Sequence, residues 1–273
     1  MTRPPVTSDE RIARQIRTEI EAGRLPHGTK LPSVRQIAAD YSASSSTVGR
    51  ALTLLSEQGL IVTKGRSGAV VHYPIGDEDS QAQPPVVLLV GGYAGSGKTE
   101  LGRIIARETH WPMLDKDSTT RPVVEAALTT LGLSPHDRES ETYRTTIRPA
   151  EYEALNMGME ENLECGTSCV LTAPFVAEFG DSAWCERTRS RIAGLGGTAA
   201  FVWVRCDPDT MHTYIRKRGA ARDAAKMADW STWVASLDLE FAPATEHTVV
   251  DNSAGAPPLQ QQANELLAKV TTR

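Results

Sequence analysis

Ten residues near the middle of the chain, GGYAGSGKTE from Gly91 to Glu100, constrain its fold more than any other stretch. They follow the aliphatic run VVLLV, which is typical of a central parallel strand buried on both faces. They lead into KTELGRIIARET, whose apolar residues recur at helical spacing. A strand, a glycine-rich turn and a helix in this order predict one unit of a parallel α/β sheet.

The turn itself has the spacing G-x-x-x-x-G-K-[ST] between Gly92 and Thr99. Glycines let backbone N–H groups point inward around phosphate oxygens at the start of the helix. A lysine at this place reaches the β and γ phosphates, and the hydroxyl after it binds Mg²⁺. We therefore expect ATP and Mg²⁺ as cofactors, with Thr99 as the metal ligand. The predicted phosphate-binding residues are Gly92, Gly95, Ser96, Gly97, Lys98 and Thr99.

Four more strands are predicted after the turn, with helical segments between them. They lie in WPMLD up to Asp115, in TSCVLTAPF around Val170, in TAAFVWVR up to Arg205 and in HTVVDNS around Val249. Alternating strands and helices of this size predict a doubly wound parallel sheet, an α/β fold.

The first 72 residues have another pattern, that of three short helices and a hairpin. A first helix has a possible N-cap at Ser8 and ends at Gly23, and a second covers residues 33–41 with Val34 on its buried side. A third helix covers about residues 44–58, and two short β runs surround residues 64–68. This order predicts a winged helix-turn-helix, whose third helix enters the major groove of DNA.

Charge and composition separate the two parts. Residues 1–73 contain 10 Lys or Arg and 6 Asp or Glu, while the remaining residues contain 19 and 28, so the first part is basic and the second acidic. An imbalance of this size also arises by chance, but it suits an anionic partner for the first part alone. We expect domains at 1–72 and 86–273, with the polar segment 73–85 as a linker.

No stretch of the sequence predicts a membrane span or a signal peptide, so we expect a cytoplasmic protein with no membrane partner. The four cysteines lack the density of a disulfide framework and are expected to be reduced packing residues. A metal or redox pair of Cys165 and Cys169 is the minor alternative.

The first part resembles the N-terminal domain of GntR-family transcriptional regulators over residues 10–72. The segments LPSVRQIA, SSSTVGRALTLLSEQGL and a glycine-bearing wing occur in the family's order. The resemblance implies a double-stranded DNA operator bound by a homodimer. Ser45 and Gly49 stand where many members have arginine, so we do not expect the family's most frequent operator. Solvated surface charge is the alternative for each basic residue. The implied DNA-binding residues are Arg35, Ser45, Ser46, Thr47, Arg50, Lys64, Arg66 and Gly68.

The second part resembles small P-loop kinases of the zeta-toxin and chloramphenicol-phosphotransferase-like group over residues 85–267. The resemblance implies a carboxylate, Asp117 or else Asp115, that accepts the proton of an attacking hydroxyl; a plain helix N-terminal aspartate is the alternative. It also implies a lid whose arginines stabilise the transferred phosphoryl group, against a solvated helix face. These lid residues are Arg216, Arg218 and Arg222, with Arg218 and Arg222 on one helical face. Asp251 and Asn252 lie where the group contacts adenine.

One position departs from the kinase pattern. Thr172 stands in VLTAPF where related enzymes often carry an aspartate near the metal. A hydroxyl still bonds a magnesium-bound water but brings no charge, although Asp115 is placed to hold the metal's water shell instead. Two functions therefore stay open: a transcriptional regulator whose second domain senses a nucleotide and a small effector, which we favour, and a small-molecule kinase that phosphorylates an acceptor hydroxyl.

Overall fold

Strand β3 (Val86–Gly91) is buried along its whole length, and its side chains alternate between two hydrophobic cores. Val87 and Leu89 belong to one core, whereas Leu88 and Val90 belong to the other. A strand with apolar side chains on both faces is stable only when both faces of its sheet are covered.

The computed structural model describes residues 7–63, 68–73 and 83–271, without the side chains of Arg222 and Ala225. The chain divides into two compact units, Met1–Ala82 and Gln83–Arg273, which are described separately below. The predicted wing contacts Lys64 and Arg66 and most of the predicted linker 73–85 lie outside the described residues.

The second unit is built on a parallel sheet of five strands in the order β4-β5-β3-β6-β7. Besides β3, the strands are β4 (Met113–Asp115), β5 (Cys169–Thr172), β6 (Thr198–Arg205) and β7 (Thr248–Asp251). The chain places β4 and β5 on one side of β3 and the later strands on the other side. Ligands of such sheets bind where the strand order reverses, beyond the carboxyl ends of the strands. The predicted α/β fold is confirmed.

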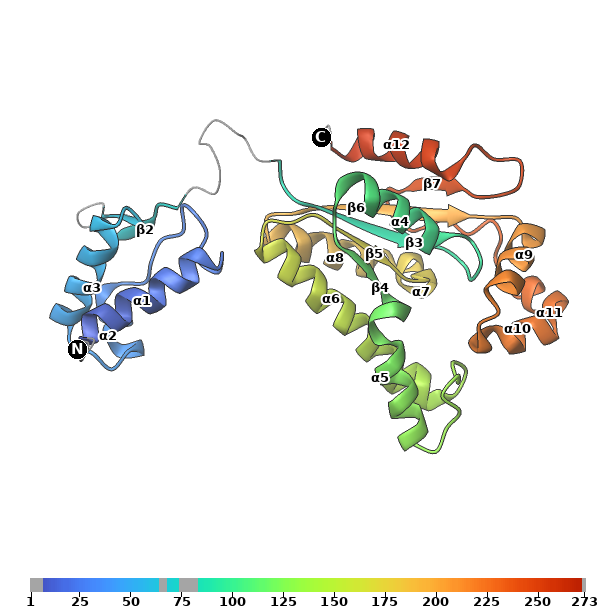
Figure 1. The fold of residues 1–273 in the computed structure, drawn as a ribbon, viewed down its shortest axis with the longest axis horizontal. Helices are drawn as coiled ribbons and strands as arrows, with labels where there is room; N and C mark the ends of the chain where they lie inside the picture. Colours follow the sequence, from blue (N-terminus) through green and yellow to red (C-terminus); the bar gives the residue numbers. More distant parts are fainter. Residues whose placement is uncertain (1–6, 64–67, 74–82, 272–273) are drawn as a thin grey trace, which may run out of the picture. The chain divides into compact units, whose positions relative to one another are not determined.

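Helices cover both faces of this sheet (Figure 1). One core includes side chains of α4 and α12, and the other includes side chains of α6, α7 and α8. The bounds of these helices are α4 Lys98–Thr109, α6 Arg148–Glu164, α7 Val176–Gly180, α8 Ser182–Gly194 and α12 Leu259–Val270.

Two further groups of helices extend beyond the strand ends (Figure 1). Helix α5 (Lys116–Thr130) and the π-helical turn η2 (Tyr143–Ile147) share a small core of their own. The other group comprises α9 Pro208–Arg218, the 3₁₀ turn η3 Ala221–Asp223, α10 Ala224–Ala228 and α11 Trp230–Ala235.

The first unit contains the predicted three helices followed by a hairpin. Its elements are α1 Ser8–Glu21, α2 Val34–Asp40, α3 Ser45–Glu57, β1 Ile61–Thr63 and β2 Ala69–Val71. Strands β1 and β2 pair antiparallel, and Ile12, Ile16 and Ile20 line the buried side of α1. The predicted winged helix-turn-helix arrangement is thereby confirmed.

Three details of the prediction are wrong. The N-cap of α1 is Thr7, since its backbone is extended and Ser8 is already helical. Val34 is 38% exposed, because it is the first residue of α2 and lies before the helix reaches the core. Helix α9 ends at Arg218, because Gly219 adopts a left-handed conformation with φ 58°, so Arg218 and Arg222 do not share a helical face.

Candidate functional site

The glycine-rich turn forms a close-packed loop between β3 and α4. Gly97 has φ 97° and directly precedes Lys98, the first residue of α4. A Cβ atom on Gly97 would lie 2.3 Å from the side-chain nitrogen of Asn252, so glycine is required there. The loop therefore combines a left-handed glycine, a helix N-terminus and a contact with the residue after β7, as a phosphate cradle does.

Two groups inside this loop fit a phosphate chain. The Ser96 hydroxyl is buried and has no hydrogen-bond partner among the described residues. Lys98 Nζ donates to the carbonyl oxygen of Tyr93 at 2.9 Å, and burial lowers the pKa of this ammonium to about 8, against the opposing charge of Asp117. Phosphate oxygens accept hydrogen bonds from a hydroxyl and favour a charged lysine, so both groups would gain a partner.

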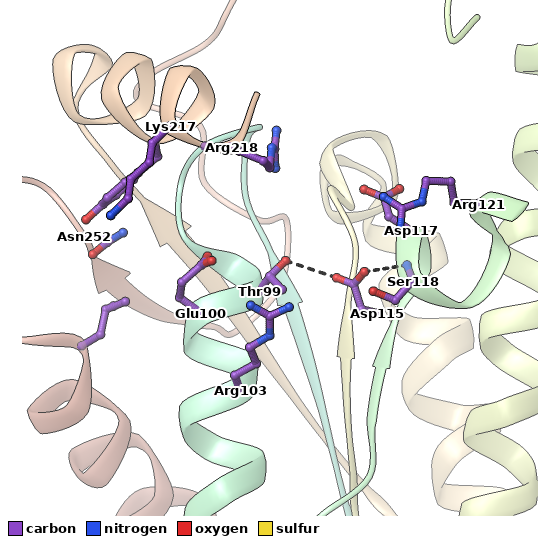
Figure 2. Close-up of a pocket in the computed structure, with 13 residues that line it drawn as sticks. Thr99, Glu100, Arg103, Asp115, Asp117, Ser118, Arg121, Lys217, Arg218 and Asn252 are labelled. Carbon is purple, nitrogen blue, oxygen red and sulfur yellow. Dashed lines mark hydrogen bonds between the residues drawn. The ribbon is translucent and has the colours of Figure 1, made fainter. Parts of the chain in front are cut away.

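Asp115 joins three elements at the carboxyl edge of the sheet. Its Oδ2 accepts hydrogen bonds from Thr99 Oγ1 at 3.2 Å and from Thr172 Oγ1 at 2.7 Å, and its Oδ1 accepts from the backbone N–H of Ser118 at 2.8 Å. Figure 2 shows Asp115 facing Thr99 of α4. A hydroxyl beside a carboxylate offers the oxygen ligands that Mg²⁺ prefers.

The departure at Thr172 has a structural counterpart. Asp115 and Thr172 are register partners on the adjacent strands β4 and β5. A carboxylate on β4 therefore stands one strand away from the position where related kinases often have one on β5. The charge for a metal is present, although on a different strand.

Asp117 lies on the first turn of α5 and has a buried lysine beside it. Lys116 Nζ is 3.1 Å from Asp117 Oδ1 and donates to Glu151 Oε1 at 2.8 Å. Glu151 also accepts hydrogen bonds from Thr120 at 2.8 Å and from the Tyr143 hydroxyl at 2.7 Å. These four buried side chains form one hydrogen-bond network, and its lysine holds the Asp117 carboxylate in position.

The predicted lid arginines have different surroundings. Arg218 donates to Asp223 Oδ2 at 2.6 Å and lies beside the cradle, whereas Arg216 is exposed and lines neither of the two cavities described below. The backbone of Arg222 lies in η3, and its side chain is outside the described residues. Lys217, which was not among the predicted lid residues, lines the cavity beside the cradle, and Arg216 does not line it.

Asn252 closes the cradle from the side of β7. Its Nδ2 donates to the carbonyl oxygen of Ser96 at 3.0 Å. Its neighbour Asp251 instead pairs with Arg205 at 2.7 Å, which holds that carboxylate at the edge of the sheet. The structure thus brings Asn252, and not Asp251, to the loop.

Two cavities meet at these residues. One of about 540 Å³ lies between α4, α5, α9 and Asn252, and is drawn in Figure 2. The other, of about 660 Å³, lies between the cradle, α5, the segment 138–152 and α7. Thr99, Asp115, Asp117 and Arg218 line both. The second cavity was missed from the sequence because Arg138, Arg144 and Arg148 form no motif.

The predicted DNA-contacting residues cluster on the first unit. Ser45, Ser46 and Thr47 form the first turn of α3, where the Ser44 hydroxyl accepts from the Thr47 backbone N–H at 3.1 Å. This capping bond fixes the start of the helix that would enter a groove.

The remaining described contacts of the prediction lie on α2, on α3 and just before β2. Arg50 is exposed on α3, and its Nε donates to Asp9 of α1 at 3.3 Å. Arg35 is exposed on α2, and Gly68 is exposed with φ 93°. These residues provide cations and hydroxyls on the surface of the helix-turn-helix unit.

The described residues contain neither a metal-binding cluster nor a membrane-spanning helix. No group of three or more His, Cys, Asp or Glu in the described ranges is arranged to hold a metal ion. No described helix is long and apolar enough to cross a membrane. Cys165, Cys169, Cys185 and Cys206 are free thiols.

Family models match both units. Residues 8–71 match the model of bacterial regulatory proteins of the gntR family. Residues 87–239, more than half of the chain, match the model of an AAA domain. The chain belongs to the AAA domain family. The resemblance to GntR regulators is confirmed for the first unit. A GntR-type helix-turn-helix domain thus precedes an AAA domain with a P-loop, which implies nucleotide binding.

Individual relatives match the chain only in part. The HTH-type transcriptional regulator Rv1152 of Mycobacterium tuberculosis is 34% identical over 73 residues, 25% of this chain and 60% of the relative. The vitamin B6 salvage pathway transcriptional repressor PtsJ of Salmonella typhimurium is 31% identical over 119 residues, 42% of this chain and 28% of that protein. The chain thus spans less than two thirds of the length of either relative.

Among solved structures, a gluconokinase from Sinorhizobium meliloti is similar to the chain with a TM-score of 0.46 and 18% identity. The similarity covers 70% of this chain and 94% of the gluconokinase.

Proposed function

We propose that the protein is a transcriptional regulator that binds operator DNA through its helix-turn-helix domain and binds ATP with Mg²⁺ through its AAA domain. The observation that carries this proposal is the joining, in one chain, of a GntR-type domain and a P-loop in which Lys98 and Ser96 fit a phosphate chain. Nucleotide binding then changes the affinity for DNA, provided that nucleotide binds the two DNA-binding arrangements unequally.

The AAA domain divides the binding of the nucleotide among three groups of residues. Lys98 and the backbone N–H groups of the loop would hold the phosphates, and Asn252 would face the adenine. Thr99 and Asp115 would hold the magnesium ion, which would neutralise charge on the phosphate oxygens. Thr172 positions the Asp115 carboxylate through their 2.7 Å hydrogen bond.

Operator binding would involve Arg35, Thr47 and Arg50, with phosphate contacts from the wing and a homodimer on two half-sites. Arg50, whose side chain is 62% exposed, pairs with Asp9 in the free protein, and a bond from so exposed a guanidinium costs little to exchange for a DNA contact.

The decisive experiment is a titration of the full-length protein against its own upstream DNA, followed by fluorescence anisotropy. Mg²⁺ with ATP should shift the dissociation constant about 5- to 150-fold, as typical allosteric couplings do. A non-hydrolysable ATP analogue should give the same shift, because binding alone is required. An unchanged DNA affinity with nucleotide bound would remove nucleotide control from the proposal.

A second candidate function is phosphoryl transfer to a hydroxyl, because Asp117 and Arg218 line both cavities. Asp117 would take the proton of the attacking hydroxyl, and Arg218 would stabilise charge on the transferred group. The kinase predicts ADP release that depends on an acceptor and is lost on Asp117→Asn. ADP release that ignores every added acceptor would exclude it.

A further inference from the structure

We infer that the 660 Å³ cavity of the AAA domain binds a small anionic compound carrying a hydroxyl group, through Arg138 and Arg144. The inference rests on the proposed function, since it assigns this cavity to a ligand bound next to the nucleotide. It adds to that function the chemical class of the second ligand and the residues that recognise it.

The charge of the cavity is opposite to that of the domain around it. Seven of its described lining residues are Lys or Arg and three are Asp, whereas residues 74–273 carry 9 more acidic than basic side chains. A concave site lined mainly by one sign of charge concentrates field lines and attracts ligands of the opposite sign. The cavity therefore favours an anion within an acidic domain.

Two of these cations already have buried carboxylate partners. Lys116 pairs with Glu151 at 2.8 Å, and Arg148 pairs with Glu178 at 2.6 Å. Breaking such a pair would leave a buried carboxylate without a partner, which opposes the use of these cations for a ligand. They shape the cavity rather than supply free donors.

Arg138 and Arg144 are differently placed. Arg138 Nη1 donates only to backbone carbonyl oxygens among the described residues, and its guanidinium lies 5.1 Å from the centre of the Tyr143 ring. Arg144 pairs with Glu139 at 2.6 Å, but the two side chains are 61% and 78% exposed. An ion pair so exposed contributes little and is readily exchanged for a ligand. These two guanidinium groups are therefore available to an anion.

Tyr143 anchors the segment 138–144, which carries both arginines. Tyr143, between the two arginines in sequence, is 6% exposed and donates to Glu151 Oε2 at 2.7 Å. Burial and this hydrogen bond raise the pKa of the Tyr143 hydroxyl, which keeps it a donor. Tyr143 begins the π-helical turn η2, a conformation frequent at functional sites. The anchor places both arginines beside the cavity before any ligand binds.

The same cavity offers an acceptor for a hydroxyl. Asp117 lines it, 3.1 Å from Lys116, and its carboxylate oxygens accept hydrogen bonds. Tyr152, Trp233 and Leu237 also line the cavity. A cavity of this volume holds a metabolite-sized molecule. The lining therefore suits a ligand that carries both a phosphate or carboxylate group and a hydroxyl group.

The test uses the full-length protein with its cradle filled by Mg²⁺ and a non-hydrolysable ATP analogue, so that a free phosphate loop does not bind the probe. Glycerol 3-phosphate, glycerate and uncharged glycerol are titrated by calorimetry at low salt. We expect millimolar or tighter binding of at least one anionic probe and no binding of glycerol. The two anionic probes distinguish a phosphate ligand from a carboxylate ligand.

The double variant Arg138→Ala/Arg144→Ala should bind the anionic probe at least 10-fold more weakly, while its nucleotide affinity stays within about two-fold of the unaltered protein. Arg187→Ala, which removes an arginine that is 67% exposed on α8, is the matched control and should change neither affinity. Circular dichroism and the retained nucleotide affinity show that the double variant is folded.

Three results would overturn the inference: no anionic probe binds the nucleotide-loaded protein, the double variant binds it as tightly as the unaltered protein does, or glycerol binds equally well. Failure of the nucleotide titration that precedes these measurements is a separate outcome, which contradicts the proposed function itself. Normal nucleotide binding without anion binding contradicts the inference alone.

Discussion

At the scale of single residues, folding and phosphate binding favour different protonation states of Lys98: burial disfavours its charge, whereas a bound phosphate favours it. Burial lowers its pKa from 10.5 to about 8. Between these two pH values the unfolded chain binds more protons than the folded chain, so the free energy of unfolding rises with pH. Below about pH 8 both states are protonated at this site, and the full cost of burying the charge is present.

Lys98→Met should therefore stabilise the nucleotide-free protein at pH 7 by about 1 kcal/mol, a value reduced from the full pKa shift because the side chain is only partly buried. The gain should shrink as pH rises from about 8 to 10.5, and nucleotide affinity should fall at least 10-fold. Urea unfolding at several pH values measures the first effect and calorimetry the second. The exposed Lys269→Met is the control. A variant less stable at pH 7 would show that the hydrogen bond to Tyr93 outweighs the burial cost.

Thr172 allows a second residue-scale prediction, because its hydroxyl is 2.7 Å from Asp115 Oδ2. Thr172→Asp places a second carboxylate there, and like charges this close repel each other until a cation separates them. We expect a loss of about 1 kcal/mol of stability without Mg²⁺ and stronger Mg²⁺ dependence of nucleotide binding. Thr172→Val removes the hydrogen bond without adding charge and should show no such gain. Equal Mg²⁺ dependence in both variants would place the metal away from Asp115.

At the scale of elements, the sequence predicted the strands, the helices and the glycine-rich loop, each of which depends on residues close together in the chain. It did not predict contacts between elements that are far apart in the chain. The loop from Gly92 to Thr99 and the strands were predictable because apolar runs and glycines act within a few residues. The pairing of Asp115 with Thr172 requires the strand order, which one sequence does not contain. The helix break at Gly219 was overlooked because the arginines on both sides suggested one continuous face.

The start of α3 allows a prediction at the same scale. The Ser44 hydroxyl accepts from the Thr47 N–H at 3.1 Å and lies 2.8 Å from the Ser46 and Thr47 hydroxyls. Ser44→Ala should cost about 1 kcal/mol of stability and weaken DNA binding, since it frees the end of the helix that would read DNA. Thermal unfolding and anisotropy measure the two effects.

Ser44→Asp separates those two effects. Aspartate is an equally good N-cap, so stability should be retained, whereas its charge beside DNA phosphates should still lower DNA affinity. If the aspartate variant binds DNA as well as the unaltered protein does, the first turn of α3 does not lie near the DNA backbone.

At the scale of the whole molecule, the distribution of charge suits two different anionic ligands. The basic first 73 residues suit DNA, while 10 of the 19 Lys and Arg residues of the acidic remainder line the two cavities around the cradle. The net negative charge of residues 74–273 disfavours DNA phosphates, whereas the cations that line the two cavities favour nucleotide phosphates there. Each polyanion is directed to its own domain.

The last prediction concerns the coupling between the domains, which is reciprocal if it is allosteric. Mg²⁺ and the ATP analogue change the dissociation constant for DNA by some factor. Operator DNA must change the dissociation constant for the nucleotide by the same factor, because both changes belong to one thermodynamic cycle. Calorimetric titration of nucleotide into the protein, with and without saturating operator DNA at constant salt, measures the second factor. DNA without the operator is the control for simple competition among polyanions. Lys98→Met should abolish both factors together while leaving nucleotide-free DNA binding unchanged. Two unequal factors would mean that the change in DNA affinity arises from turnover or from free Mg²⁺, and not from nucleotide bound in the cradle.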